Sequence, residues 1–265
     1  MYTYGVDFSG AMNAGRKIWI STGIVKSNYL HIEGCFRINA LSNTNRRDKS
    51  LESLVKLIGK SKFALFGFDF PFSIPEDIIG YGTWEQFIHS FYRNYPDEKS
   101  FKESCWIRAG NREKRRLTEI EKSTPFSSYN LRIYKQTYYG IRDVLEPIVR
   151  KKLGYILPMQ VPKNDKPWIF EVCPASTLKK EGIYLSYKGN SSNNREAREK
   201  ILNHFEDRGR LVMPHSHLKE LIIQNCDGDA LDSIIANYAV FEIFTSGAID
   251  NTIAKKYMLE GYVYA

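Results

Sequence analysis

The sequence of 265 residues is poor in cysteine and has no long apolar run. Its four cysteines are scattered without a Cys-x-x-Cys spacing, which argues against a disulfide framework or a cysteine zinc site. No stretch of about 18 apolar residues occurs, so we expect neither a membrane-spanning helix nor a membrane partner. The first residues also lack the basic and then apolar regions of a secretory signal. These absences predict a protein of the reducing cytoplasm.

Common nucleotide-binding and nucleophile motifs are missing as well. The sequence contains no Gly-x-Gly-x-x-Gly motif, no Walker loop and no Gly-x-Ser-x-Gly motif. His215 and His217 do not have the His-Glu-x-x-His spacing of a zinc protease, which favours a solvated loop over a metal site. Ser9 lies in a predicted turn with no base near it in the sequence, so a serine nucleophile is poorly supported.

Positive charge is in excess, and most of the excess lies in one segment. The chain carries 38 Lys and Arg against 30 Asp and Glu, a formal net charge of +8. Residues 86–152 contain 15 basic and 8 acidic residues, and therefore +7 of that charge. Aromatic residues interleave with these cations, a combination typical of surfaces that bind nucleic acid. An alternative stays open, in which the rings form a core and the cations are merely solvated. The residues that we expect to hold a nucleic-acid backbone are Arg108, Arg112, Lys114, Arg115, Arg116, Arg132 and Lys135.

The order of the expected elements indicates an α/β fold. Five stretches have the composition of strands and are bounded by turn residues: 2–8, 17–24, 28–37, 63–69 and 168–172. Apolar residues at helical spacing predict helices over about 51–58 and 229–244. Hairpins at one edge and a crossover to parallel central strands give a mixed sheet flanked by helices.

Three segments divide this fold. Residues 1–75 and 158–265 supply the strands and the last long helix of one α/β core. Residues 76–157 carry the basic excess and are predicted to form a mostly helical insertion. The clearest helix of this middle part spans 131–148, and we expect Pro147 to kink or end it.

Five carboxylates interrupt apolar surroundings. Asp7 and Asp69 lie near the carboxyl ends of predicted strands, where ligands bind in open α/β sheets. Asp229 and Asp232 are three residues apart, so a helix presents both on one face. Glu171 lies within a short apolar strand. Carboxylates that are brought together repel one another unless a cation is present, and their hard oxygens suit Mg²⁺ or Mn²⁺.

Four of these five acids also have a structural explanation when each is taken alone. A strand-terminal aspartate such as Asp7 or Asp69 is a common turn former. Asp229 suits the first turn of a helix, where an acid stabilises the macrodipole. Glu171 could pair with a buried arginine. The joint occurrence of the five acids is what favours a metal site.

Several motifs resemble a single family along nearly the whole chain. They are Tyr4–Ala11, Gly67–Phe72, Arg115–Gly140, Glu171–Ser176 and Asp229–Ser233. These residues resemble the domain-of-unknown-function 429 family, whose members are regarded as predicted nucleases with an RNase H-like fold. The helix motif Asp229–Asp232 is also similar to the last motif of RuvC-type Holliday-junction resolvases. The chain departs from the family pattern at Glu119, where Asp is expected, and at Cys173, where Tyr or His is usual.

The residues and the resemblance together predict a nuclease that hydrolyses DNA or RNA by a two-metal mechanism. Two Mg²⁺ or Mn²⁺ ions would be held by Asp7, Asp69, Asp229 and Asp232. Glu171 would be a further ligand or would position the attacking water. Two other classes stay open: a non-catalytic nucleic-acid-binding module on an RNase H-like fold, and an ATP-dependent phosphotransferase of the actin and sugar-kinase type. The turn at residues 7–10 motivates the phosphotransferase, but that class needs two such cores, for which 265 residues are too few.

Overall fold

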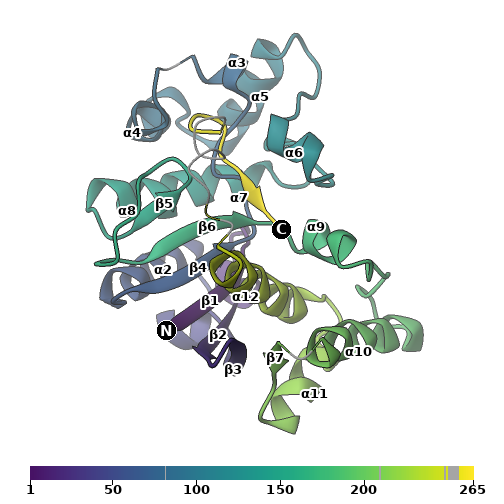
Figure 1. Cartoon of the computed structure of the whole chain (residues 1–265). Coiled ribbons are helices and arrows are strands. Elements are labelled where there is room, and N and C mark those ends of the chain that lie inside the picture. The colour runs from purple at the N-terminus through teal and green to yellow at the C-terminus, as the bar shows by residue number, and fades with distance from the viewer. Residues whose placement is uncertain (81, 209, 248, 250–256) are drawn as a thin grey trace.

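The computed structural model describes residues 1–80, 82–208, 210–247, 249 and 257–265 (Figure 1). Its strands are β1 Tyr2–Asp7, β2 Trp19–Lys26, β3 Tyr29–Arg37, β4 Ala64–Phe68, β5 Tyr155–Leu157, β6 Trp168–Val172, β7 Leu211–Val212 and β8 Val263–Tyr264. Within the described residues they form one sheet of eight strands, in the order β5-β6-β4-β1-β2-β3-β7, with β8 beside β6.

The directions of the strands confirm the predicted mixed α/β fold. Strand β2 pairs antiparallel with both β1 and β3. Strand β4 pairs parallel with both β1 and β6. An antiparallel meander on one side of β1 and parallel strands on the other is the arrangement expected of an RNase H-like sheet.

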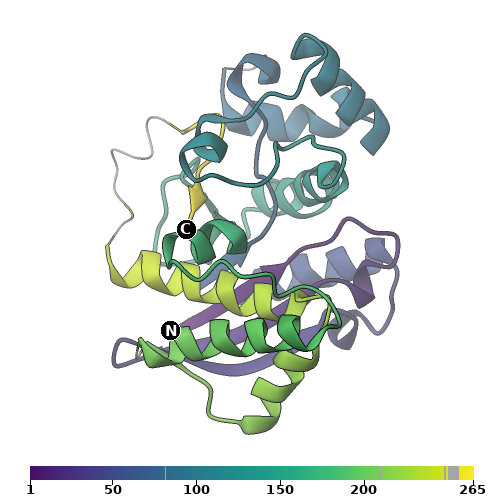
Figure 2. The ribbon, with the colours of Figure 1, turned by 90° about the vertical axis from the view of Figure 1, so that its right-hand side faces the viewer.

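Helices cover both faces of this sheet. They are α1 Asn39–Ser42, α2 Arg47–Lys60, α3 Glu76–Ile79, α4 Trp84–Asn94, α5 Glu98–Arg108, α6 Leu117–Glu121, α7 Tyr134–Gly140, α8 Glu146–Arg150, α9 Pro174–Lys180, α10 Ser192–Asp207, α11 Ser216–Gln224 and α12 Asp229–Thr245, with short turns η1 Ala14–Arg16 and η2 Ile141–Leu145. Helix α12 lies across the strands, with α10 and α11 beside it (Figure 2). Helix α2 and turn η2 share a core with the opposite face. None of the helices in the described ranges is both long enough and apolar enough to cross a membrane.

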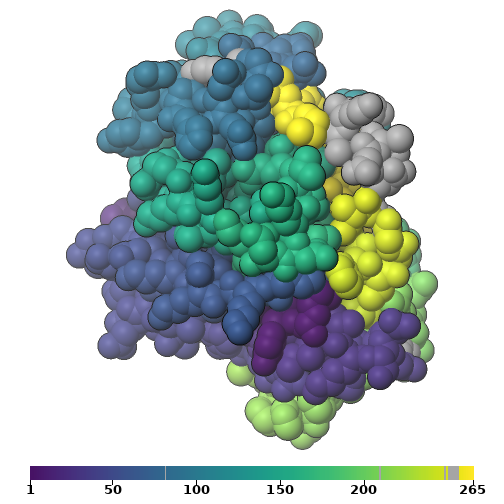
Figure 3. Space-filling model, turned by 60° about the vertical axis from the view of Figure 1, so that its left-hand side comes forward, coloured from purple at the N-terminus to yellow at the C-terminus, as the bar shows by residue number. Residues whose placement is uncertain are grey.

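The middle segment, residues 76–157, is mostly helical as predicted, and both of its halves contribute to the hydrophobic core around the sheet. Ile141 and Leu145 share a hydrophobic cluster with Val6 and Phe66 of the sheet. Strand β5, at the end of the segment, pairs with β6. From one side of the molecule, the teal and green atoms of this region lie directly against the blue atoms of the N-terminal part (Figure 3).

The helix predicted over 131–148 is observed as α7, η2 and α8 in succession, and Pro147 does not end it. Pro147 lies in the first turn of α8, directly after the π-helical turn η2. A proline lacks the backbone donor and its ring crowds the preceding turn of an α-helix. The wider π-helical turn accommodates both effects, so the helical path continues to Arg150.

Two glycines let α12 lie directly on the strands that carry the predicted aspartates. A Cβ atom added at Gly5 would lie 2.0 Å from the carbonyl oxygen of Ser233. One added at Gly67 would lie 2.6 Å from the carbonyl oxygen of Ala236. Backbone meets backbone at this distance only where a side chain is absent. The two glycines thus help to set the start of α12 beside the ends of β1 and β4.

Replacing Gly5 with Ala should lower the free energy of unfolding by about 2–3 kcal/mol, because the added methyl group meets backbone that has no rotamer to change. Gly34→Ala in β3 is a matched control, since its Cβ would meet only the Thr22 hydroxyl oxygen at 3.2 Å. Urea denaturation measures both variants. Equal losses would contradict the account of helix–strand packing.

Candidate metal centre

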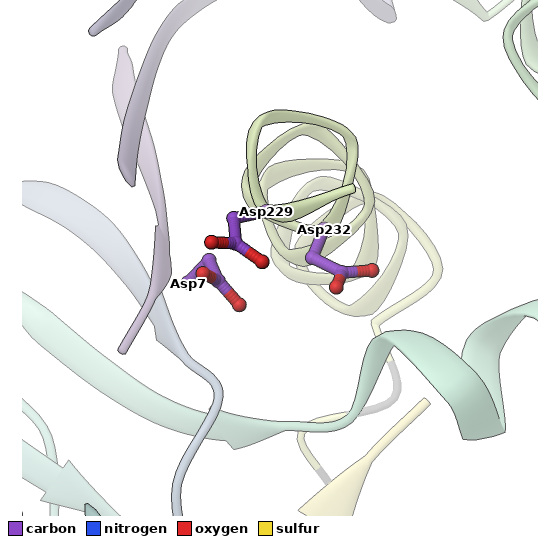
Figure 4. A group of neighbouring side chains, drawn as sticks. All are labelled: Asp7, Asp229 and Asp232. Carbon is purple, nitrogen blue, oxygen red and sulfur yellow. The ribbon is translucent and has the colours of Figure 1, made fainter. Parts of the chain in front are cut away.

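The carboxylates of Asp7, Asp229 and Asp232 come together at the carboxyl end of β1 (Figure 4). One oxygen from each lies within 4.8 Å of the other two. Asp7 is the last residue of β1, and the other two lie in the first turn of α12. We call these three residues the acidic group. The acidic group brings together predicted site residues from the first strand and from the last long helix.

The acidic group is poorly solvated, and its members repel one another. The exposed fractions of Asp7 and Asp232 are 8% and 2%. Burial, followed by the charges of Asp232 and Asp229, raises the pKa of Asp7 well above its ordinary value. Burial also raises the pKa of Asp229. Ionising Asp7 and Asp229 together is therefore unfavourable unless a further cation lies close to them.

Asp69 lines the same cavity but is outside the acidic group. Its backbone N–H donates to the carbonyl oxygen of Val6 at 3.1 Å, which fastens the end of β4 beside β1. Burial, together with the charge of Asp232, raises the pKa of Asp69 to about 8. The structure thus places Asp69 near the three carboxylates without bringing its oxygens among them.

Glu171 faces the other side of the sheet. In the parallel register Glu171 lies opposite Phe68, and Phe68 lies opposite Val6. Phe68 and Val6 both point into the core shared with α2. Because side chains alternate along a strand, Asp7 points the opposite way from Val6, towards α12. Glu171 lines the same cavity, but the structure does not bring it among the three carboxylates, so its role as a further ligand or in positioning water stays a prediction.

Glu171 is instead paired with Arg116, which is 1% exposed. The Nη1 atom of Arg116 donates to one carboxylate oxygen of Glu171 at 2.9 Å, and Nη2 donates to the other oxygen. The Nε atom donates to Glu119 at 2.7 Å. Burial acts to lower the pKa of Arg116, but the charges of Glu171 and Glu119 outweigh it and raise that pKa. Arg116 lines the cavity of the acidic group, but its guanidinium is held by these two buried carboxylates, so the contact with nucleic acid that we expected of it stays a prediction.

Five of the other six basic residues in this prediction are exposed, namely Arg108, Arg112, Arg115, Arg132 and Lys135. The sixth, Lys114, is partly buried. Lys114 forms an ion pair with Asp77, and Arg108 donates to the carbonyl oxygen of Ile78. Arg132 lies 5.3 Å from the ring centroid of Phe126, and both residues line the cavity of the acidic group. Among these six, the cavity wall contains Arg132 alone.

Sequence reasoning missed two residues that touch the acidic group. The Nζ atom of Lys188 lies 2.6 Å from Oδ2 of Asp232. The hydroxyl of Tyr187 donates to Oδ1 of Asp232, also at 2.6 Å. Burial acts to lower the pKa of Lys188, but the charges of Asp232 and Asp7 outweigh it and raise that pKa. No local pattern marks these residues, since the loop between α9 and α10 reaches α12 only through tertiary packing.

The acidic group opens into a cavity of about 560 Å³. The ends of β1 and β4, the loop before α10 and part of the middle segment line it. The cations Lys17, Arg132 and Lys188 are among its lining residues. The cavity thus combines a cluster of carboxylates with positively charged walls.

Comparisons of the chain with models of protein families, with curated proteins and with solved structures found no match. The resemblance to the domain-of-unknown-function 429 family accordingly stays a prediction. The case for a function rests on the geometry and charge of this cavity.

Mn²⁺ should raise the melting temperature more at pH 8 than at about pH 6. Because the pKa values of Asp7 and Asp69 are raised, the folded chain holds protons that the unfolded chain loses above about pH 4. The stability that these protons contribute falls as the pH rises from about 4 towards 8. Below pH 8 a Mn²⁺ ion must displace these protons in order to bind, which weakens its binding. Thermal denaturation with and without Mn²⁺ measures the difference. The Asp7→Asn variant is the control and should lose the Mn²⁺ effect at both pH values. Equal shifts of the wild-type melting temperature at pH 6 and pH 8 would contradict the account.

Proposed function

We propose that the protein is a metal-dependent nuclease that hydrolyses phosphodiester bonds in DNA or RNA. The observation that carries this proposal is the acidic group, with three carboxylates from β1 and α12 within 4.8 Å of one another. Hard oxygen donors of this kind fit Mg²⁺ or Mn²⁺. The RNase H-like sheet and the resemblance to the domain-of-unknown-function 429 family support the same class of enzyme. Such an ion, when bound, supplies an activated water and stabilises the charge of the leaving oxygen.

The chain's own residues would divide the remaining work. Asp7, Asp229 and Asp232 would hold the ion. Arg132 and Lys17, on the cavity wall, carry charges that suit the phosphates of a strand. The ring of Phe126, next to Arg132, offers a surface on which a base could stack.

The direct test is cleavage by the wild-type protein. Labelled single-stranded and double-stranded DNA and RNA are incubated with Mn²⁺, with Mg²⁺ or with EDTA. We expect cleavage of at least one substrate with a divalent ion and none with EDTA. Intact substrates under all of these conditions would contradict the proposal.

The contact between Lys188 and Asp232 favours a second candidate, a nucleic-acid-binding module that uses no metal. The Lys188 ammonium, 2.6 Å from Asp232, already offsets part of the negative charge of the acidic group. Nucleic-acid binding that weakens with salt, is unchanged by EDTA and is accompanied by no cleavage would support this module. Binding that requires Mn²⁺ would exclude it.

The phosphotransferase hypothesis receives no such support. The described residues form a single sheet, whereas that class needs two cores. The turn after β1 is tied to the protein itself: Gln136 donates to the carbonyl oxygen of Phe8 at 2.6 Å, and Arg47 donates to that of Gly10 at 2.9 Å. We therefore do not propose it.

A further inference from the structure

The fold itself holds Lys188 beside the acidic group. Lys188 lies in the loop between α9 and α10, and the N–H of the next residue, Gly189, donates to the carbonyl oxygen of Cys226 at 2.8 Å. Buried Arg198 of α10 donates to the carbonyl oxygens of Tyr187 and Gly189. The backbone is thus fastened on both sides of Lys188.

The turn before α12 is shaped to receive this loop. Gly228 has φ 80°, a left-handed conformation that favours glycine. A Cβ atom added there would lie 3.0 Å from Cγ of Lys188 and 2.9 Å from the ring of Tyr187. Lys188 therefore packs against the N-terminal end of α12 along its aliphatic stem, and its ammonium extends to Asp232.

Asp232 has donors from the chain on both of its oxygens. The ammonium of Lys188 lies 2.6 Å from Oδ2, and the Tyr187 hydroxyl donates to Oδ1 at the same distance. The carboxylate is also nearly inaccessible to water, at 2% exposed. Lys188 is thus a built-in counter-ion for one of the three carboxylates.

We infer that the acidic group binds one divalent ion and that Lys188 takes the place of a second. Three ionised carboxylates carry three negative charges, and Lys188 supplies one positive charge. The two negative charges that remain equal the charge of a single Mg²⁺ or Mn²⁺. A second ion would have to use Asp69, which lies outside the acidic group, or the oxygen of Asp232 that faces Lys188. This inference rests on the proposed function, but it replaces the two ions predicted from the sequence.

Counting bound Mn²⁺ by titration calorimetry tests this inference. We expect one ion per chain for the wild type and for Lys188→Arg, which keeps the charge. Lys188→Met removes the charge at similar length, so we expect the count to rise from one ion to two. Lys219→Met is the matched control, because Lys219 pairs with Glu206 at the same distance of 2.6 Å but does not line this cavity, and its count should stay at one.

The outcomes separate this inference from the proposed function. Two ions on the wild type would overturn the role of Lys188 and leave the nuclease proposal standing. No ion on the wild type would contradict the metal site itself. A single ion on a Lys188→Met variant with the circular dichroism spectrum of the wild type would also overturn the inference. If that variant does not fold, the number of ions bound to the wild type still tests the inference. Lys188 can replace a second ion only if the wild type binds a single one.

Discussion

Replacing Arg116 with Met should lower the free energy of unfolding by about 3–5 kcal/mol, the usual loss when one partner of a buried ion pair is removed. Met fills much of the space of the arginine but donates no hydrogen bond. Glu119 and Glu171, which are 1% and 2% exposed, would then be buried without a cation. The Nη1 atom also donates to the carbonyl oxygen of Glu260 at 2.8 Å, so the variant loses a link to the C-terminal segment as well.

Arg115→Met is the matched control for this variant. Arg115 is the preceding residue, but it is exposed, and its side chain donates to the carbonyl oxygen of Pro125 at 3.2 Å. We expect the control to change stability by less than about 0.5 kcal/mol. Urea denaturation compares the two variants with the wild type. A loss below about 1 kcal/mol for Arg116→Met would show that the buried network does not stabilise the fold.

Replacing Asp7 with Asn should reduce metal-dependent cleavage by about 1,000-fold or more. The amide has the size of the carboxylate but carries no charge, and it removes one of three ligands that lie within 4.8 Å of one another. A metal ion contributes several kcal/mol to stabilising the transition state, and about 4 kcal/mol corresponds to a factor of about 1,000 in rate.

Loss of activity and loss of fold are distinguishable in this variant. Burial and neighbouring carboxylates raise the pKa of Asp7, so its ionised form destabilises the metal-free protein. Asp7→Asn should consequently be no less stable than the wild type without metal, as thermal denaturation can measure. Asp48→Asn, an exposed change at the Arg46 ion pair, should cleave at the wild-type rate. Cleavage by Asp7→Asn within tenfold of the wild type would contradict the role of Asp7.

The sheet and the acidic group were predictable because both depend on local patterns. Apolar runs at 63–69 and 168–172 became β4 and β6, since strands buried on both faces are continuously apolar. The carboxylate of Asp7 lies close to the two acids of α12 because the end of strand β1 and the start of α12 are at the same edge of the fold.

The remaining features of the site depend on contacts that no local pattern encodes. The face on which Glu171 lies is set by its register with Phe68, and a shift of one residue would reverse it. The burial of Arg116 depends on Glu171, which is 55 residues away in the sequence. Lys188 reaches Asp232 across 44 residues, through a loop held by α10 and by the turn before α12.

The central claim is that the acidic group is a site for a divalent ion. A crystal grown with Mn²⁺ and measured at a wavelength where manganese scatters anomalously tests this claim most directly. We expect one anomalous peak among the carboxylates of Asp7, Asp229 and Asp232, with Lys188 still on Asp232. An anomalous map without a peak at these carboxylates would contradict the claim.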